Sequence, residues 1–154
     1  MKMSPYEYVT HQRDAKLEYQ VCKWLRDQNE HEKFEFVWRV VRMNPGLGIP
    51  LVKKIQLRPV YLEVILEHGF VYGDASTVRL WYEATVGGLG ERRVLQLITA
   101  HLERAPLIVD KMLYWFRPSD EVLMHEAREL KKKFEEKYPN FKSSRSTGIH
   151  ATGA

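Results

Sequence analysis

The sequence predicts an all-α fold, and three observations lead to this prediction. Apolar residues recur through most of the chain at the three- and four-residue spacing that lines one face of a helix. No stretch shows the strict alternation of apolar and polar residues that is typical of a half-buried strand. Prolines, glycines and capping residues divide the chain into about seven or eight segments of helical length.

The composition indicates one globular domain, which we expect to span residues 1–140. The 154 residues are 44% hydrophobic and 29% charged, and these fractions exclude a disordered chain. Cys22 is the one cysteine, which excludes a disulfide within the chain and indicates a reducing, intracellular compartment. No apolar run is long enough to cross a membrane, so we expect no membrane insertion.

Helices of the N-terminal third are predicted from their caps and apolar spacing. Ser4 resembles an N-cap and Pro5 a first-turn residue, so the range 4–27 is expected to be one helix. A second helix is expected from residue 34 to the Asn44-Pro45-Gly46 sequence, which ends it. Pro50 is then expected to begin a short helix that reaches Ile55.

Later helices are predicted in the same way. A helix beginning at Pro59 is expected to end at His68-Gly69, and another is expected over the range 74–84. Gly87, Gly88 and Gly90 are expected to form a turn between helices. The remaining expected helices are residues 91–104, residues 106–116 and a long helix that Ser119 caps and that runs to about residue 138.

A repeated pattern organises the second half of the sequence, with a period of about 33 residues, which is typical of helical hairpins in α-solenoids. Pro106 and Pro139 each follow a predicted long helix, and they are separated by one such period. A shift by one period superposes Leu80 on Leu113 and Leu97 on Leu130. The sequence therefore predicts a short α-solenoid of helical hairpins, with an irregular helical bundle as the alternative.

The hairpin over residues 77–106, and the helix that ends at Tyr138-Pro139, resemble tetratricopeptide and pentatricopeptide repeats. Tetratricopeptide repeats have small residues where this chain has Tyr82 and His101. Pentatricopeptide repeats that read RNA bases have polar side chains where this chain has Leu80 and Leu113, and leucine cannot hydrogen-bond a base edge. The resemblance therefore implies a helical scaffold that lacks the base-reading side chains.

The chain is also similar, in size and repeat type, to an extra pentatricopeptide-like subunit of euglenozoan mitochondrial F1-ATPase. This resemblance implies a structural subunit attached to the catalytic head of the enzyme, with the F1 α subunits as partners. It also implies a location in the mitochondrial matrix. No single motif of the sequence carries the likeness.

Catalytic and metal-binding motifs are not found in the sequence, so we expect neither an enzyme nor a cofactor. Among six histidines, His125 forms a same-face pair with Glu129, and the repeat would stack His68 on His101. A structural metal site needs three or more converging ligands, so a pair does not predict one. The glycine-rich run from Gly87 to Gly90 does not follow a strand and lacks the context of a phosphate-binding loop.

Two functions are consistent with the charge pattern. The net charge is +4, and residues 1–60 hold eleven Lys or Arg against seven Asp or Glu. We expect a protein-binding module that docks on a larger complex, and the alternative is a protein that binds single-stranded RNA through its basic N-terminal third. The candidate contact residues in that third are Arg13, Lys23, Arg39, Arg42, Lys53 and Lys54.

Residues 141–154 are expected to form an extended C-terminal tail. They contain few apolar side chains that a core could bury. We therefore expect a partner chain to hold the tail in place, through Phe141, Arg145 and Ile149.

Overall fold

The computed structural model describes residues 2–141, and within this range the protein is all-α, with no strand. This confirms the predicted fold class. No helix in the described range is long and apolar enough to cross a membrane. The helices are α1 (Pro5–Val9), α2 (Ala15–Arg26), α3 (Glu30–Met43), α4 (Pro45–Lys54), α5 (Pro59–Tyr72), a 3₁₀-helix η1 (Ala75–Thr77), α6 (Val78–Leu89), α7 (Glu91–Ala100), α8 (Pro106–Trp115) and α9 (Glu121–Lys137).

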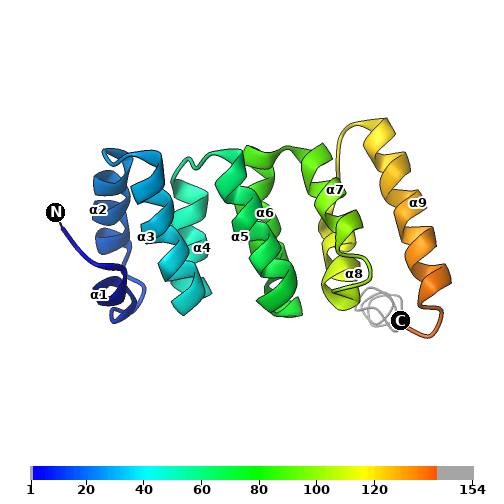
Figure 1. Ribbon diagram of the computed structural model, residues 1–154, viewed down its shortest axis with the longest axis horizontal. Helices are drawn as coiled ribbons and strands as arrows, with labels where there is room; N and C mark the ends of the chain where they lie inside the picture. The colour runs from blue at the N-terminus through cyan, green and yellow to red at the C-terminus, as the bar shows by residue number, and fades with distance from the viewer. Residues whose placement is uncertain (1, 142–154) are drawn as a thin grey trace.

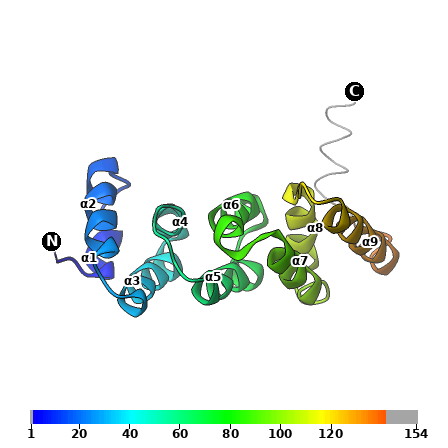
Figure 2. The same ribbon diagram turned by 90° about the horizontal axis from the view of Figure 1, so that it is seen from above.

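The helices stand side by side in a row that runs from α1 and α2 at one end to α9 at the other (Figure 1). Seen from above, α4 and α6 lie on one side of the row, and α3, α5 and α7 lie on the other (Figure 2). Helix α4 packs on α3 and α6, and α6 packs on α5 and α8. Each helix therefore contacts mainly helices that are near it in sequence.

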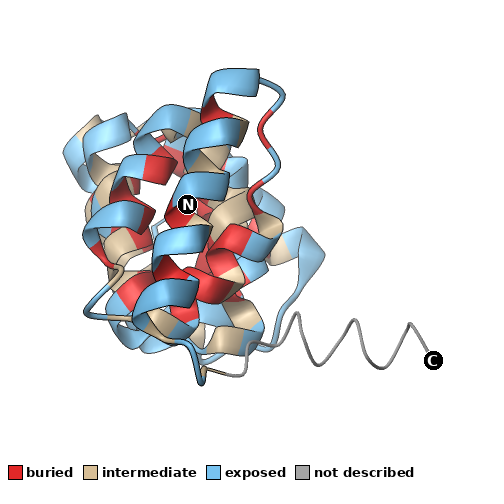
Figure 3. Ribbon diagram, turned by 90° about the vertical axis from the view of Figure 1, so that its right-hand side faces the viewer, coloured by how far each residue is buried: buried red, intermediate tan, exposed pale blue. Residues whose placement is uncertain are grey.

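The core runs along the row between its two sides. Figure 3 looks along the row and shows buried and exposed residues following one another along single helices. This is the pattern of helices that turn one face to their neighbours and the other to solvent. The most buried large side chains come from successive helices, for example Leu25, Val37, Leu51, Leu66, Ile98 and Met112.

Helix spacing is less regular than one constant period. Helices α2, α4, α6 and α8 begin at Ala15, Pro45, Val78 and Pro106, so the intervals between successive starts are unequal. A fixed shift by one period therefore pairs Leu80, which is 50% exposed, with Leu113, which is 5% exposed. The two leucines do not occupy equivalent environments, and the α-solenoid stays a prediction.

Ion pairs bridge helices that are two apart along the row. Arg93 of α7 donates to Glu63 of α5 through its Nε at 3.0 Å, and Arg92 lies 3.7 Å from Glu126 of α9. Lys137 of α9 also pairs with Glu103, in the turn after α7. These contacts are at the surface, so we expect them to contribute little to the stability of the fold and mainly to fix the register of neighbouring helices.

Two glycines allow neighbouring helices to pack closely. A Cβ atom at Gly48 of α4 would lie 2.5 Å from the Cα of Val41 in α3. A Cβ atom at Gly69 of α5 would lie 2.8 Å from the indole ring of Trp81 in α6. The α3–α4 and α5–α6 contacts therefore depend on the absence of a side chain at these positions.

The prediction of one helix over residues 4–27 is wrong, and this split gives nine α-helices in the described range instead of seven or eight. Ser4 does cap α1, but α1 ends at Val9. Asp14 is extended, and its carboxylate accepts hydrogen bonds from the N–H groups of Lys16 and Leu17, as an N-cap does. The break turns α1 so that the ring of Tyr8 packs against Phe36.

Several predicted helix ends are also wrong. Helix α4 begins at Pro45 and contains Pro50 in its interior. Proline removes the N–H that would bond the carbonyl of Gly46, but Gly46 is exposed, so water can satisfy that carbonyl. Helix α5 continues past Gly69 to Tyr72, because Gly69 serves close packing on Trp81 and does not end the helix.

The predicted glycine turn is formed by one glycine only. Gly87 and Gly88 lie inside α6, and Gly90 makes the turn with a φ of +84°, a left-handed conformation that favours glycine. Helix α7 ends at Ala100, earlier than predicted. Asp120, and not Ser119, caps α9 through hydrogen bonds to the next turn.

Two glycines in helix interiors should respond to alanine in opposite ways. Gly48→Ala forces a methyl group against the α3 backbone, and we expect it to lower the free energy of unfolding by about 2 kcal/mol. Gly87→Ala meets no atom within 4 Å, and we expect it to raise that free energy by about 0.5–1 kcal/mol. Urea unfolding followed by circular dichroism measures both. A Gly48→Ala variant as stable as the unmodified chain would contradict the close α3–α4 contact.

Candidate partner-binding surfaces

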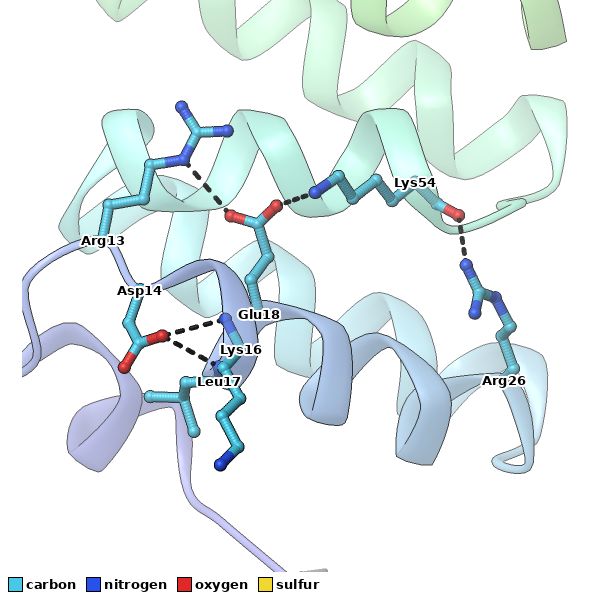
Figure 4. Close-up of polar contacts among 7 residues, drawn as sticks. All are labelled: Arg13, Asp14, Lys16, Leu17, Glu18, Arg26 and Lys54. Carbon is cyan, nitrogen blue, oxygen red and sulfur yellow. Dashed lines mark hydrogen bonds and ion pairs between the residues drawn. The ribbon is translucent and has the colours of Figure 1, made fainter.

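A buried carboxylate links α2 to α4. Glu18 of α2 is 1% exposed, and its two carboxylate oxygens face two cations from opposite sides (Figure 4). The Nε of Arg13 lies 3.3 Å from one oxygen, and the ammonium group of Lys54 pairs with the other. A charge this deeply buried is costly unless it is paired, so the two cations offset the cost of burying Glu18.

The backbone on both sides of Glu18 is also held. The Asp14 cap fixes the start of α2 one turn before Glu18. At the other end of the cluster, the guanidinium group of Arg26 donates to the carbonyl oxygen of Lys54 at 3.3 Å (Figure 4). Lys54 is therefore held through its ammonium group and its carbonyl group, and the end of α4 is fixed against α2.

Tyr8 and Cys22 lie near Glu18 and are kept in their neutral forms. Burial raises the pKa of Tyr8 to about 12, and the negative charge of Glu18 contributes further. Burial also raises the pKa of the Cys22 thiol. A buried thiol with a raised pKa is a poor nucleophile, so the role of Cys22 is packing.

A groove runs between α4 and α6, on the side of the row where these two helices lie. One part of it, of about 390 Å³, is lined by Arg13, Lys53, Lys54, Pro45, Gly46, Ile49, Pro50, Leu80 and Glu83. A second part, of about 440 Å³, is lined by Val52, Lys53, Ile55, Gln56, Leu57, Leu62, Glu83, Ala84, Gly87 and Gly88. The two parts share Lys53 and Glu83, and we call them together the α4–α6 groove.

Helix α5 exposes an apolar stripe that we call the α5 outer face. It consists of Val60, Val64 and Val71, which are exposed and whose four- and seven-residue spacing places them on one side of the helix, where the part-exposed Glu67 also lies. Leu62, Ile65 and Leu66 of the same helix are buried against its neighbours. Helix α5 therefore carries apolar side chains on its outer side as well as on its inner side.

Aromatic side chains gather where α3, α5 and α6 meet. The ring of His68 packs edge-on against Trp38, with centroids 5.0 Å apart, and also contacts Trp81. The guanidinium carbon of Arg42 lies 5.1 Å from the centre of the Trp38 ring. Burial, and then the positive charge of Arg42, lower the pKa of His68 and favour its neutral form.

The structure brings together only part of the basic candidate set. Arg13, Lys53 and Lys54 line the same groove. Lys23 is exposed on α2, and the Nε of Arg39 pairs with Glu35 at 3.6 Å, in a separate pocket beside Trp24 and Phe36. Arg42 lies against Trp38, so the candidates do not form one continuous basic stripe.

Phe141 is the one candidate of the C-terminal tail that lies within the described range. Its ring packs edge-on against Phe134 of α9, with centroids 5.2 Å apart. This intramolecular contact makes Phe141 part of the domain edge. Arg145 and Ile149 lie outside the described residues.

The same-face pair of His125 and Glu129 does not form a contact. His125 is exposed, and the carboxylate of Glu129 accepts a hydrogen bond from Lys132 at 3.2 Å. No group of three His, Cys, Asp or Glu side chains in residues 2–141 is placed to hold a metal ion. His101, which was expected beside His68, instead stacks on Phe70 at 4.5 Å.

Two features of these surfaces were missed in the sequence. The spacing of Val60, Val64 and Val71 could have been read as a second apolar face of α5, opposite the first. Glu18 has no such signal, because a carboxylate on a helix is ordinarily exposed, and its burial depends on Lys54, which is 36 residues away.

Comparisons with protein-family models, with curated proteins and with solved structures gave no match to this chain. The likeness to helical-repeat families therefore stays a prediction, and the functional argument is built from the surfaces described above.

Removing Glu18 should cost less stability than removing its two partners. In Glu18→Leu, the half-exposed Arg13 and Lys54 can turn to water, and a leucine fits the buried site, so we expect a loss below about 1 kcal/mol. The Arg13→Ala/Lys54→Ala variant leaves a buried, unpaired carboxylate, and we expect a loss of about 3 kcal/mol. Urea unfolding at pH 7 measures both. The opposite order of stability would show that Glu18 is hydrated and not buried.

Alkaline pH should destabilise the fold partly through Tyr8. The folded protein holds the Tyr8 proton more tightly than the unfolded chain, in which tyrosine titrates near pH 10. The stability contributed by Tyr8 is therefore complete below about pH 10 and is lost as the pH rises toward 12. We expect Tyr8→Phe to flatten the fall in unfolding free energy between pH 9.5 and 11.5. Burial also raises the pKa values of Tyr82 and Cys22, and both should contribute to the slope that remains. If the unfolding free energy fell equally steeply with pH in the unmodified chain and in Tyr8→Phe, the raised pKa of Tyr8 would be contradicted.

Proposed function

We propose that the protein is a non-catalytic, protein-binding subunit that docks on a larger complex. The α5 outer face is the observation that supports this proposal. Exposed apolar side chains on the outer side of a helix are typical of a helix that a partner covers there, and α5 lies at the surface of the row. A partner that covers the outer face would remove Val60, Val64 and Val71 from water.

Local preference does not explain the exposed valines. Valine is a weaker helix former than alanine, leucine or lysine, because its branched side chain loses rotamer freedom in a helix. On an exposed helix face it also leaves apolar surface in contact with water. Contiguous apolar surface on a small protein marks a contact site more often than scattered single side chains do.

Charged groups lie next to the α5 outer face. Glu67 of α5 lies on the same side of the helix as the three valines, and Glu63 of α5 pairs with Arg93 of α7. An apolar centre with a polar rim is the usual anatomy of a protein–protein interface. This arrangement supports docking through α5, with α7 at the edge of the contact.

The specific partner that we propose is the mitochondrial F1-ATPase head, with its α subunits as the docking surface. The support for this proposal is the likeness in size and repeat type to the pentatricopeptide-like subunit of the euglenozoan enzyme. It would place the protein in the mitochondrial matrix. The docking proposal itself does not depend on this partner.

Binding of single-stranded RNA is the alternative, and the cluster of Arg13, Lys53 and Lys54 favours it. Glu18 pairs with two of these three cations, which weakens the field that they can offer to a phosphate backbone. Leu80, on the same groove, offers no hydrogen bond to a base. Protein docking is therefore the better supported of the two functions.

Affinity purification from the native source tests the proposal with a matched pair of variants. Val60→Asp changes the second residue of α5, and Val122→Asp changes the second residue of α9. The two valines are similarly exposed, at 62% and 58%, so both variants should fold. We expect Val60→Asp to lower the recovery of stoichiometric partners about tenfold or more, and Val122→Asp to leave it unchanged.

Each sample is divided into nuclease-treated and untreated halves and quantified by mass spectrometry. Partners that survive nuclease and depend on Val60 would support docking through α5. Partners that disappear with nuclease, together with RNA recovered from the untreated half, would support the alternative. Equal recovery with both variants would rule out the α5 outer face as the docking site.

A further inference from the structure

The α4–α6 groove has the dimensions of a site for an extended peptide. Its two parts meet at Lys53 and Glu83, so the groove follows α4 along its length. Helix α4 has 10 residues, which corresponds to about 15 Å at 1.5 Å per residue. An extended chain advances about 3.3 Å per residue, so four to five residues would span that length.

One end of the groove carries an excess of positive charge. Arg13, Lys53 and Lys54 line it, and the single buried carboxylate of Glu18 leaves two positive charges in excess there. Glu83, on the α6 side, is neutralised by Arg79, whose Nε donates to it at 2.7 Å. Because Glu18 already fixes two of the cations, an arriving anion would not have to order them.

Lys53 is the cation of this set that is free to bind an anion. It is exposed, lines both parts of the groove, and makes no ion pair with any residue of the described chain. Arg13 and Lys54 remain about half exposed, so each can share its charge between Glu18 and a ligand. The cationic end therefore favours an anionic group.

The other end of the groove has mixed polar and apolar lining, and its α6 wall beyond Glu83 has no large side chain. Ala84, Gly87 and Gly88 of α6 line it opposite Ile55 and Leu57. A Cβ atom at Gly88 would clash with Leu62, so packing on α5 explains that glycine. A Cβ atom at Gly87 would meet nothing within 4 Å, so no contact in the described chain requires a glycine there.

Glycine inside a helix costs about 0.5–1 kcal/mol relative to alanine. At Gly87 the absence of a side chain opens the α6 backbone to close approach from the groove. A second polypeptide chain lying in the groove would use that space. This is a separate observation from the positive charge, and both point to the same occupant.

The lining of the groove fits a peptide better than a nucleic acid. Pro50 and the half-exposed Leu80 offer aliphatic surface beside the cations. No aromatic ring is among the described residues that line either part, whereas single-stranded nucleic acids bind by stacking bases on such rings. A ligand with an aliphatic side chain next to a carboxylate would match both the aliphatic surface and the cations of the groove.

We infer that the α4–α6 groove binds an extended segment of a partner protein in which acidic and aliphatic residues alternate. The acidic side chain lies between Arg13 and Lys53, and the backbone passes close to Gly87. None of the α5 outer-face residues takes part. The groove is thus a second contact site, and it can be tested without the docking partner.

Fluorescence anisotropy with labelled peptides tests this inference on the full chain. The probes are three twelve-residue peptides. In each, every second residue is valine or serine, and the residues between them are all glutamate, all lysine or all glutamine. We expect the glutamate peptide to bind at least about tenfold more tightly than the lysine peptide, with an affinity that falls as salt is raised. We expect Lys53→Glu to weaken its binding about tenfold or more, while Lys133→Glu, an equal charge change on exposed α9, leaves it unchanged.

Gly87→Leu separates binding from folding. Its side chain would enter the open space at Gly87, so we expect the variant to melt at the same or a higher temperature and to lose the glutamate peptide. Equal binding of the glutamate and lysine peptides, or unchanged binding by both Lys53→Glu and Gly87→Leu, would overturn the inference. If a labelled oligouridylate bound more tightly than the glutamate peptide, and Lys53→Glu abolished that binding, the inference would be overturned in favour of RNA. A Val60→Asp chain should bind the peptide normally, so the groove and the α5 outer face can fail independently.

Discussion

The constraint on which the structure depends is that each helix buries its apolar face against helices nearby in the sequence. The close contacts of Gly48 with Val41 and of Gly69 with Trp81 join helices along the row, and no single centre gathers all of the described helices. A row of this kind has a large surface for its length, since every helix keeps one side in water. That leaves α5 with an uncovered apolar side and α4 and α6 with a groove between them.

Glu18 connects the stability of the N-terminal end to the chemistry of the groove. Its carboxylate holds Arg13 and Lys54 in place, and the Asp14 cap and the Arg26 contact hold the backbone around it (Figure 4). The same pairing that offsets the burial of one acid also arranges two cations beside Lys53. A structural ion pair can therefore also prepare a binding site, because the cations it orders remain partly exposed.

Helix type was predictable from local information, but helix ends were less so. Ser4 and Pro106 mark real helix starts, because capping and proline geometry act within one turn. Gly69 was misread as a helix end, because its role is to fit against Trp81, which a local pattern does not contain. For the same reason the sequence placed Arg13, Arg39 and Arg42 in one candidate set, although Arg39 and Arg42 lie apart from the groove that Arg13 lines.

The sequence by itself determined the all-α class, most of the helices, the absence of a thiolate cluster and the basic excess of the first third, because these follow from spacing and composition within a few residues. Only the tertiary structure decided that Glu18 is buried between two cations, that Val60 and Val64 face outward, and that Gly87 is open while Gly88 is packed. The physical reason is the distance along the sequence over which each interaction acts. Burial and ion pairing depend on residues that are distant in the sequence, and the uneven spacing of the helices sets which residues meet.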